Sequence, residues 1–474
     1  MIYARNSIAS SLLLLLLMLL VACGATSLAP LGQVVLTPTE GHAEETRVPT
    51  STSVPPTYTV TAESTSTPTP VPPVIQRPYD ESVFGVEISR GRVPEVLELA
   101  HEANVSWVRY NGIVWHEVER TEGERDWSTL ATVERDLRAL SDAGLTPIVI
   151  VRGTPEWAQK VPGALCGPIR EEALDAFASF LGELVTRYSA PPYNVRYWEI
   201  GNEPDVDPTL IDSTLPFGCW GDQSDALYGG GYYAEMLEHV YPAMKAVNPQ
   251  VEVVIGGLLL DCDPTRPPEG KDCQASNFLE GILQNGGAAY FDVVAYHAYP
   301  YWNPDVPDSD VTGTAWEHRG GLLLGKLRFI EEVMARYGVD KPILMNEGGL
   351  LCHPSNPLCP SEDFHAAQAS YLVRLYTRAW ANGLLGAVWY TLDGPGWRHG
   401  GLLTEDETPR PAYEALRFIS TLLDGAILTD VLDDEGLEGY EFHKADTSYR
   451  VYWNNNRATV RLRLPEGVRA VYNT

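Results

Sequence analysis

Short apolar runs alternate with longer amphipathic segments from residue 79 to about residue 423. The runs are almost continuously apolar, which is the pattern of strands buried on both faces of a parallel sheet. We predict eight such strands, at residues 83–88, 107–115, 147–151, 195–200, 251–255, 293–296, 343–345 and 387–390. A predicted helix follows each strand, at residues 94–103, 130–140, 172–188, 232–247, 277–284, 322–337, 366–381 and 412–423. Eight strand–helix units predict an α/β fold, a (β/α)8 TIM barrel over residues 79–423, with a doubly wound sheet as the alternative.

After about residue 424 the period of the apolar pattern changes to two. Residues 441–443, 449–453 and 460–464 are predicted as short strands of a small antiparallel β domain over residues 424–474. Three consecutive asparagines at 454–456 predict a hairpin turn. We expect the aromatic side chains at 452 and 453 to pack against the barrel.

The first 23 residues have the anatomy of a secretory signal. Arg5 precedes a leucine-rich run at residues 12–20, which is too short for an ordinary membrane-spanning helix. The run leads into Leu-Val-Ala-Cys ending at Cys23, which resembles the bacterial lipobox. We predict a lipoprotein signal peptide over residues 1–23 and a lipid on Cys23. An uncleaved anchor and an ordinary signal peptide are the alternatives.

Residues 24–78 are dominated by threonine, serine and proline and contain few aromatic residues. Such a segment cannot bury enough apolar surface to fold, so it predicts a disordered tether. We therefore expect an extracytoplasmic protein, held by its lipid at the bacterial cell membrane.

Charge and cysteine content narrow the possible partners. The chain has 63 acidic and 34 basic residues, and a net charge of −29 would repel nucleic acid. Six cysteines besides Cys23 predict disulfides in an exported chain, although six allow 15 pairings. Their closeness in sequence favours Cys262–Cys273 and Cys352–Cys359, which leaves Cys166–Cys219.

Zinc is the rival for these cysteines, but no paired Cys-x-x-Cys spacing occurs in the sequence. The chain also lacks a His-Glu-x-x-His motif and a glycine-rich phosphate loop with its lysine. We therefore expect no metal, no cofactor and no obligatory protein partner.

Polar residues gather at the carboxyl ends of the predicted strands, where barrels of this type hold their catalytic groups. The fourth strand leads into Asn202 and Glu203, and Glu347 follows the seventh. Arg109 lies in the second strand, and His297 follows the sixth. Aromatic residues follow several of the same strands: Trp157, Tyr299, Trp302 and Trp389. Paired carboxylates among aromatic side chains that stack on sugars are what glycoside hydrolysis requires.

These residues resemble the clan A glycoside hydrolases. The resemblance rests on Asn202 and Glu203 after strand four, on Glu347 after strand seven and on His297-x-Tyr299 after strand six. It also includes further runs: Trp-His-Glu-Val-Glu at 115–119, Gly-Glu-Arg-Asp-Trp at 123–127, Gly-Leu-Leu at 401–403 and Arg-Pro-Ala-Tyr at 410–413. The resemblance covers the whole barrel. Family 39 fits best, because its members tend to carry a small β appendage, and family 5 is next.

The resemblance implies a retaining glycosidase with two glutamates in different roles. Glu203 would be the general acid/base, with a pKa raised by burial and by the second carboxylate. Glu347 would be the nucleophile, kept ionised by hydrogen bonds and by a cation such as Arg109. Asn202 would hydrogen-bond the sugar 2-hydroxyl.

Three further roles follow from the same resemblance. Tyr299 would orient the nucleophile, His297 would shape the pocket for the cleaved sugar, and Trp389 would form its floor. The alternative for His297 is a buried core histidine, and for Arg109 a purely structural ion pair. Trp157 and Trp302 either stack on sugar or pack under their loops.

Glu199 and Asp205 flank the fourth-strand motif, and we expect both to point away from the site. The expected substrate is a polysaccharide or oligosaccharide, cleaved in a β-xylosidase-like or endo-glycanase-like manner. The alternatives are a non-catalytic glycan-binding surface lipoprotein and a transglycosidase. Tyr452 and Trp453 offer a second, less favoured sugar-stacking position.

Overall fold

A computed structural model describes residues 79, 82–434, 437–455 and 470. The predicted signal peptide with Cys23, almost all of the predicted tether and the predicted strand at 460–464 lie outside the described residues. None of the described helices is both long enough and apolar enough to cross a membrane.

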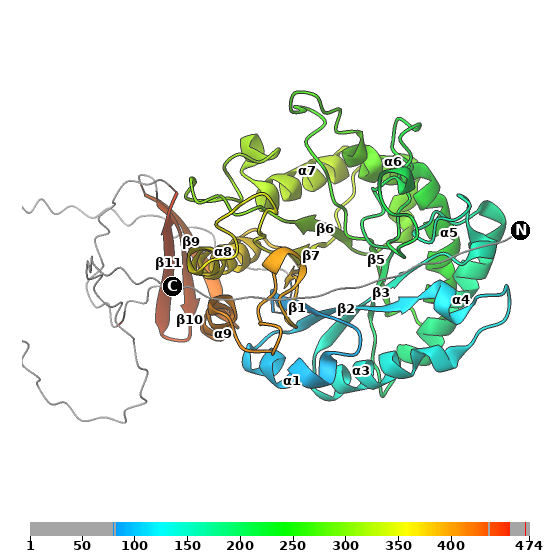
Figure 1. Cartoon of the computed structure of the whole chain (residues 1–474), viewed down its shortest axis with the longest axis horizontal. Helices are drawn as coiled ribbons and strands as arrows, with labels where there is room; N and C mark the ends of the chain where they lie inside the picture. The colour runs from blue at the N-terminus through cyan, green and yellow to red at the C-terminus, as the bar shows by residue number, and fades with distance from the viewer. Residues whose placement is uncertain (1–78, 80–81, 435–436, 456–469, 471–474) are drawn as a thin grey trace, which may run out of the picture. The chain divides into compact units, whose positions relative to one another are not determined.

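Eight parallel strands form the centre of the fold (Figure 1). They are β1 (Phe84–Ile88), β2 (Trp107–Val114), β3 (Thr146–Arg152), β4 (Tyr197–Ile200), β5 (Glu252–Ile255), β6 (Val294–Ala298), β7 (Ile343–Gly348) and β8 (Gly386–Trp389). The sheet order is β5-β4-β3-β2-β1-β8-β7-β6. Parallel bridges from Val254 to Val293 and from Leu258 to Tyr296 join β5 to β6. The (β/α)8 prediction is confirmed, and the doubly wound alternative is wrong because the two outer strands meet.

Helices surround the strands on the outside (Figure 1). They are α1 (Val93–Glu102), α2 (Trp115–Val118), α3 (Ala131–Asp142), α4 (Leu174–Tyr188), α5 (Gly230–Val247), α6 (Phe278–Gln284), α7 (Leu322–Arg336), α8 (Glu362–Ala381) and α9 (Pro411–Leu423). Helix α8 begins four residues before the predicted start, because the Ser361 side chain accepts a hydrogen bond from the Phe364 backbone and caps it.

The interior of the barrel is filled by a cluster separate from the core between strands and helices. Its members come from seven of the strands or their immediate flanks: Trp107, Ile148, Tyr197, Val254, Val293, Ala295, Leu344, Leu385 and Val388. Side chains alternate along a strand, so Trp107 and Tyr197 mark which positions of β2 and β4 face inward.

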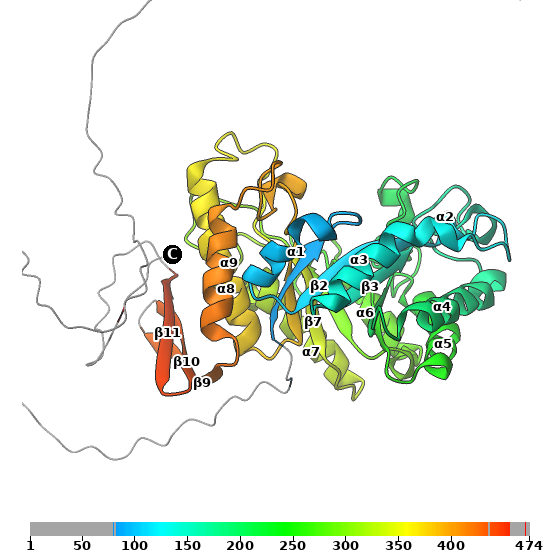
Figure 2. The same ribbon diagram turned by 90° about the horizontal axis from the view of Figure 1, so that it is seen from below.

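Three antiparallel strands form the C-terminal appendage, namely β9 (Ile427–Asp434), β10 (Leu437–Lys444) and β11 (Thr447–Asn454). The sequence pattern did not predict β9. Asn454 ends β11, and the strand to which the predicted turn would lead lies outside the described residues. The appendage lies beside α8 and α9 (Figure 2).

Trp453 packs on the barrel, as predicted. It is 8% exposed, and the Arg378 guanidinium of α8 lies 5.2 Å from the centre of its ring. Arg378 also donates to both carboxylate oxygens of Glu438 in β10, at 2.9 and 2.7 Å, and to Asp308 at 2.8 Å. One buried arginine therefore connects the appendage to the loop after β6.

Three disulfides join the cysteines in the favoured pairs, Cys166–Cys219, Cys262–Cys273 and Cys352–Cys359. Every one of these cysteines lies in a loop that follows a barrel strand and precedes the next major helix. Such loops form the rim at the carboxyl ends of the strands. The disulfides therefore stabilise the rim on which the predicted site lies.

Candidate active site

Glu203 and Glu347 meet at one histidine. Nδ1 of His297 in β6 lies 2.8 Å from Oε1 of Glu203, and its Nε2 lies 3.2 Å from Oε2 of Glu347. His297 is fully buried, whereas the two glutamate side chains are 14% and 13% exposed. The structure thus brings the two predicted glutamates together, one imidazole ring apart, at the partly open end of the barrel.

The backbone before Glu203 turns sharply. Gly201 has φ of +78°, and Glu203 itself has φ of +49°, a left-handed conformation that non-glycine residues rarely adopt. The amide of Glu203 donates to the Gly257 carbonyl at 3.1 Å, which holds this turn against the loop after β5. Backbone strain of this kind is concentrated at functional sites.

Glu347 faces the interior because β7 contains an irregularity. Tyr296 pairs with Met345, but the next residue of β6, His297, pairs with Glu347, so one residue of β7 is skipped. Strict alternation would place Glu347 on the same face as Met345, which belongs to the core between strands and helices. The extra residue places the carboxylate opposite His297 instead.

Arg109 is the hub of the site and is 1% exposed. Its Nη1 donates to Oε2 of Glu347 at 2.6 Å and to Oε2 of Glu87 in β1 at 2.5 Å. Its Nε and Nη2 donate to the two oxygens of Glu199 at 2.9 and 2.8 Å, and Nη2 also donates to Oδ1 of Asn202 at 2.6 Å. Arg109 therefore is both a structural ion-pair partner and a direct contact of Glu347.

The expectation that Glu199 points away from the site is wrong. Glu199 lies two residues after Tyr197 in β4, so alternation gives it the same inward face, where it is fully buried against Arg109. Asp205 does point elsewhere, and it accepts hydrogen bonds from the amides of Leu259 and Leu260. Glu87 was not among the predicted site residues, although it is the lone charged residue in the apolar run of β1.

Burial and neighbouring charges shift the pKa values of Glu347, His297 and Glu87 in different ways. Burial alone would raise the pKa of Glu347, but the facing His297 and Arg109 bring it below the usual value for a glutamate. Burial lowers the pKa of His297, but Glu347 and Glu203 outweigh it and raise that pKa above its usual value. Burial raises the pKa of Glu87 to about 7, although Arg109 opposes this. At neutral pH Glu347 is therefore ionised.

Both oxygens of Glu347 accept hydrogen bonds. The Tyr299 hydroxyl donates to Oε1 at 2.5 Å, while Arg109 occupies Oε2. Burial, and then Glu347 itself, raise the pKa of Tyr299 well above its usual value, so the phenol keeps its proton and remains a donor. Asn202 accepts from Arg109 through its oxygen, and no described residue accepts from its Nδ2. That amide is free to donate to a ligand.

The comparisons with known proteins concern the fold. No family model and no curated protein matches this chain. Among solved structures, a family 39 glycoside hydrolase from the gut symbiont Bacteroides cellulosilyticus WH2 is 21% identical, covers 81% of this chain and 73% of its own, and gives a TM-score of 0.57. A conserved exported protein from Bacteroides fragilis is 11% identical, with coverages of 81% and 89% and a TM-score of 0.58. A family 51 α-L-arabinofuranosidase from Bifidobacterium longum is 15% identical, with coverages of 81% and 84% and a TM-score of 0.54.

The chain has the fold of these glycoside hydrolases. At such identities the likeness establishes the barrel and its topology, and the chemistry must be argued from the residues at the site.

Trp389 does not face the carboxylates. It is fully buried, its ring packs against Tyr371 of α8 at a centroid distance of 6.0 Å, and its indole donates to the Gly400 carbonyl. Alternation along β8 turns Val388 inward and Trp389 outward, and the next residue, Tyr390, faces inward again. The structure thus turns Tyr390 rather than Trp389 toward the carboxylates.

Tyr390 lies beside the residues that surround Glu347. Its ring meets Tyr299 edge-on at 6.2 Å. Burial, followed by the charges of Glu87 and Glu347, raises the pKa of Tyr390. Its phenol therefore stays protonated beside the two carboxylates.

Trp157 and Trp302 have the packing role that we gave as their alternative. The Trp157 indole donates to the Glu119 carbonyl at 3.0 Å, and its ring packs edge-on against Trp115. Trp302 is 8% exposed and packs edge-on against Phe364 of α8. These contacts favour packing over sugar stacking at both positions.

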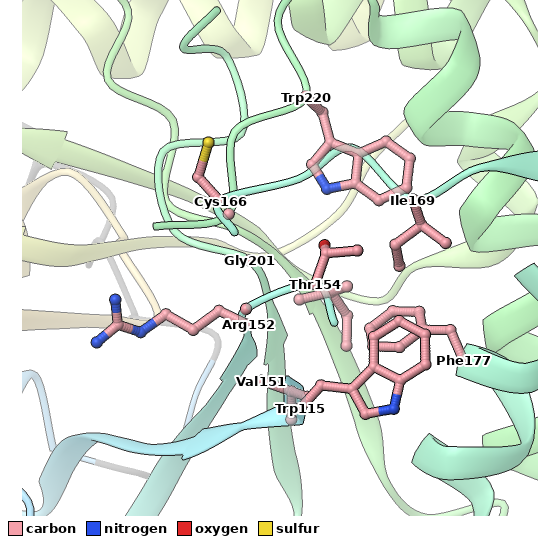
Figure 3. A pocket seen from close by; sticks show the side chains of 12 residues that line it. Trp115, Val151, Arg152, Thr154, Cys166, Ile169, Phe177, Gly201 and Trp220 are labelled. Carbon is pink, nitrogen blue, oxygen red and sulfur yellow. The ribbon is translucent and has the colours of Figure 1, made fainter. Parts of the chain in front are cut away.

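A small pocket lies behind the ends of β3 and β4 (Figure 3). Its lining is mainly apolar or aromatic and includes Trp115, Ile169, Phe177 and Trp220. Val151 and Ile200 line it from the outer face of the strands, so the pocket is separated from the carboxylates by the strands themselves. The Arg152 side chain points away from it in Figure 3.

Proposed function

We propose that this protein is a retaining O-glycoside hydrolase in which Glu347 is the nucleophile and Glu203 is the general acid/base. The observation that carries this proposal is the unequal environment of the two glutamates. Glu347 is held by Tyr299 on one oxygen and by Arg109 on the other, and its pKa is lowered. The Glu203 side chain accepts a hydrogen bond from neither Tyr299 nor Arg109. It contacts His297 instead. When two carboxyl groups lie in different environments, one can stay ionised as the nucleophile while the other acts as the proton donor.

The chemistry proceeds in two displacements. An oxygen of Glu347 attacks the anomeric carbon and forms a glycosyl ester while the glycosidic C–O bond breaks, and Glu203 gives its proton to the departing oxygen. In the second step Glu203 takes a proton from a water molecule, whose oxygen attacks the anomeric carbon and releases the Glu347 carboxylate. Asn202 donates its free amide to the sugar 2-hydroxyl, and Tyr390 lies beneath the ring.

The proposal is tested by the stereochemistry of the product. Wild-type enzyme is screened on aryl glycosides and on plant and bacterial glycans, and the first product formed is followed by proton NMR. We expect a product with the anomeric configuration of the substrate, and a 2-deoxy-2-fluoro glycoside should label Glu347 covalently. An inverted product, or a label on another residue, would contradict the assignment. Added oligosaccharide acceptors distinguish hydrolysis from transglycosylation.

His297 sets the pH dependence of this reaction. Replacing it in His297→Gln removes a group that lowers the pKa of Glu347, so that pKa rises, although Arg109 remains. Because the nucleophile must be ionised, the acidic limb of kcat/KM should move to higher pH in the variant. His239 lies on the surface and pairs with Asp175, so His239→Gln is the matched control and should keep the wild-type profile. An unmoved acidic limb in His297→Gln would show that His297 does not act on Glu347.

The proposed substrate is a polysaccharide or oligosaccharide outside the cell. The three disulfides support an oxidising compartment. We propose that the protein is held at the bacterial membrane by a lipid on Cys23, as the lipobox-like sequence indicates. Metabolic labelling with palmitate should mark the wild-type protein, and a Cys23→Ser form that still takes up label would refute the anchor.

A further inference from the structure

Two exposed aromatic residues lie on the rim near Glu347. Trp397, in the loop after β8, is 50% exposed, and Tyr301, in the loop after β6, is 37% exposed. The Arg398 guanidinium lies 4.4 Å from the centre of the Trp397 ring and 5.1 Å from that of Tyr301. His353, next to the disulfide at Cys352, meets Tyr301 edge-on at 4.9 Å. We call these four residues, Tyr301, His353, Trp397 and Arg398, the rim strip.

The rim strip is continuous with the proposed catalytic site. The Trp397 ring meets Tyr299 edge-on at a centroid distance of 6.2 Å, and the Tyr299 hydroxyl donates to Glu347. The strip therefore begins one side chain away from the nucleophile and extends outward over the loops that follow β6, β7 and β8. A ligand that extends outward from Glu347 on this side would therefore lie against the rim strip.

The backbone that carries Trp397 is held in an unusual conformation. Gly394, Gly396, Arg398 and His399 all have φ between +51° and +64°. The loop is held in place from outside: the Cys352 amide donates to the Arg398 carbonyl, and the Gln368 side chain donates to the His399 and Gly400 carbonyls. Left-handed non-glycine residues persist only where surrounding contacts impose them, and they are concentrated at ligand sites.

Arg398 has hydrogen-bonding capacity to spare. Within the described part of the chain, no carboxylate or carbonyl accepts a hydrogen bond from its guanidinium. A guanidinium has five N–H donors and no acceptor, so it matches a ligand rich in oxygen. An exposed indole beside free donors fits a sugar ring, whose C–H face stacks on an aromatic ring while its hydroxyls accept hydrogen bonds.

We propose that the rim strip is a subsite for a second sugar ring of an oligosaccharide or polysaccharide chain, next to the ring that is cleaved. This inference rests on the proposed glycosidase function and extends it, because it makes the enzyme act on chains rather than on single glycosides. Trp397 provides the stacking surface on the face that Arg398 does not cover. Arg398 donates to the hydroxyls, and the loop holding both is preformed.

The test compares an oligosaccharide, which is long enough to reach the rim strip, with a single-sugar substrate that cannot reach it. Xylosyl fluoride and xylo-oligosaccharides of two to six units are used, or the equivalent pair for the sugar that the screen identifies. In Trp397→Ala the ratio of kcat/KM for the oligosaccharide to kcat/KM for the fluoride should fall roughly tenfold, while Trp397→Phe should keep most of it. Val431→Ala, which truncates a side chain 51% exposed on the appendage, is the matched control and should leave the ratio unchanged.

The outcomes separate the two proposals. If wild-type enzyme hydrolyses the substrates but Trp397→Ala keeps the wild-type ratio, the subsite is refuted and the glycosidase function stands. If Trp397→Phe loses as much as Trp397→Ala, stacking is not the cause and the subsite is likewise refuted. If wild-type enzyme hydrolyses no glycoside or glycan of the screen, both proposals fall together. Thermal unfolding should be almost the same for all variants, because Trp397 is half exposed.

Discussion

Replacing Glu347 with glutamine is expected to lower kcat by roughly 10⁴-fold or more. Glutamine has nearly the same shape, and its single oxygen can still accept from Tyr299 or from Arg109, so the fold should be retained. Its amide cannot displace the leaving group and form a glycosyl ester. The measurement is kcat on the best substrate of the screen, together with the unfolding temperature of the variant.

Glu203→Gln is the matched partner of this experiment. It removes the proton donor but leaves the nucleophile, so substrates with activated leaving groups should still form the glycosyl-enzyme and retain partial activity. Azide needs no general base to attack the intermediate, so it should rescue turnover and yield the glycosyl azide. Hydrolysis at the wild-type rate by both variants would refute both assignments, and rescue of Glu347→Gln instead would reverse them.

Arg109→Met is expected to reduce both stability and activity. Three glutamates share this one guanidinium, at residues 87, 199 and 347, and the first two are buried. Removing the cation leaves buried carboxylates without their partner, which costs about 3–5 kcal/mol of unfolding free energy. The pKa of Glu347 also rises, so the fraction of ionised nucleophile at a given pH falls.

The sign of the pH dependence follows from linkage. Without Arg109, the pKa of Glu87 rises further above its unfolded value and the pKa of Glu347 rises with it, so the folded variant binds more protons than folded wild type and gains stability relative to it as the pH falls. The deficit of Arg109→Met against wild type should therefore be larger at pH 7 than at pH 5 in urea titrations. Arg450→Met removes a surface arginine paired with Glu441 and should change stability by less than about 1 kcal/mol.

Arg109→Lys distinguishes charge from geometry. Lysine keeps a positive charge but cannot hold Glu199 with two parallel hydrogen bonds while it also reaches Glu87, Glu347 and Asn202. We expect a loss of stability and activity between those of wild type and Arg109→Met. A stable, fully active Arg109→Met protein would show that the network does not hold Glu347, and Arg109→Lys gives the same answer if the methionine variant fails to fold.

Much of the architecture could be predicted from local pattern. Buried parallel strands are almost continuously apolar and their helices are amphipathic, so the eight units were visible one at a time. Counting the units placed Glu203 and Glu347 at strand ends on the same rim of the barrel. The appendage was harder, because β9 has the sequence Ile-Leu-Thr-Asp-Val-Leu-Asp-Asp without regular alternation, and only its pairing with β10 makes it a strand.

Which side chains face the site depended on register. Alternation along the strands turns Glu199 and Tyr390 inward, and a shift of one residue reverses the face of a strand. The family resemblance placed Trp389 at the site, whereas the structure turns Trp389 outward and Tyr390 inward. The exposed Trp397 lies in a loop whose conformation depends on Gln368 and Cys352, which are distant in the sequence.

The order of the strands and helices, the strand ends that carry Glu203 and Glu347, and the cysteines available for pairing can all be derived from the amino-acid sequence alone. These follow from local periodicity and from the order of residues along the chain. That Glu347 faces His297 depends on tertiary contacts, because the skipped residue in β7 is defined by its partners in β6. The tertiary fold also brings Glu87, Glu199 and Glu347 to Arg109, because those residues come from four strands that meet only when the barrel closes.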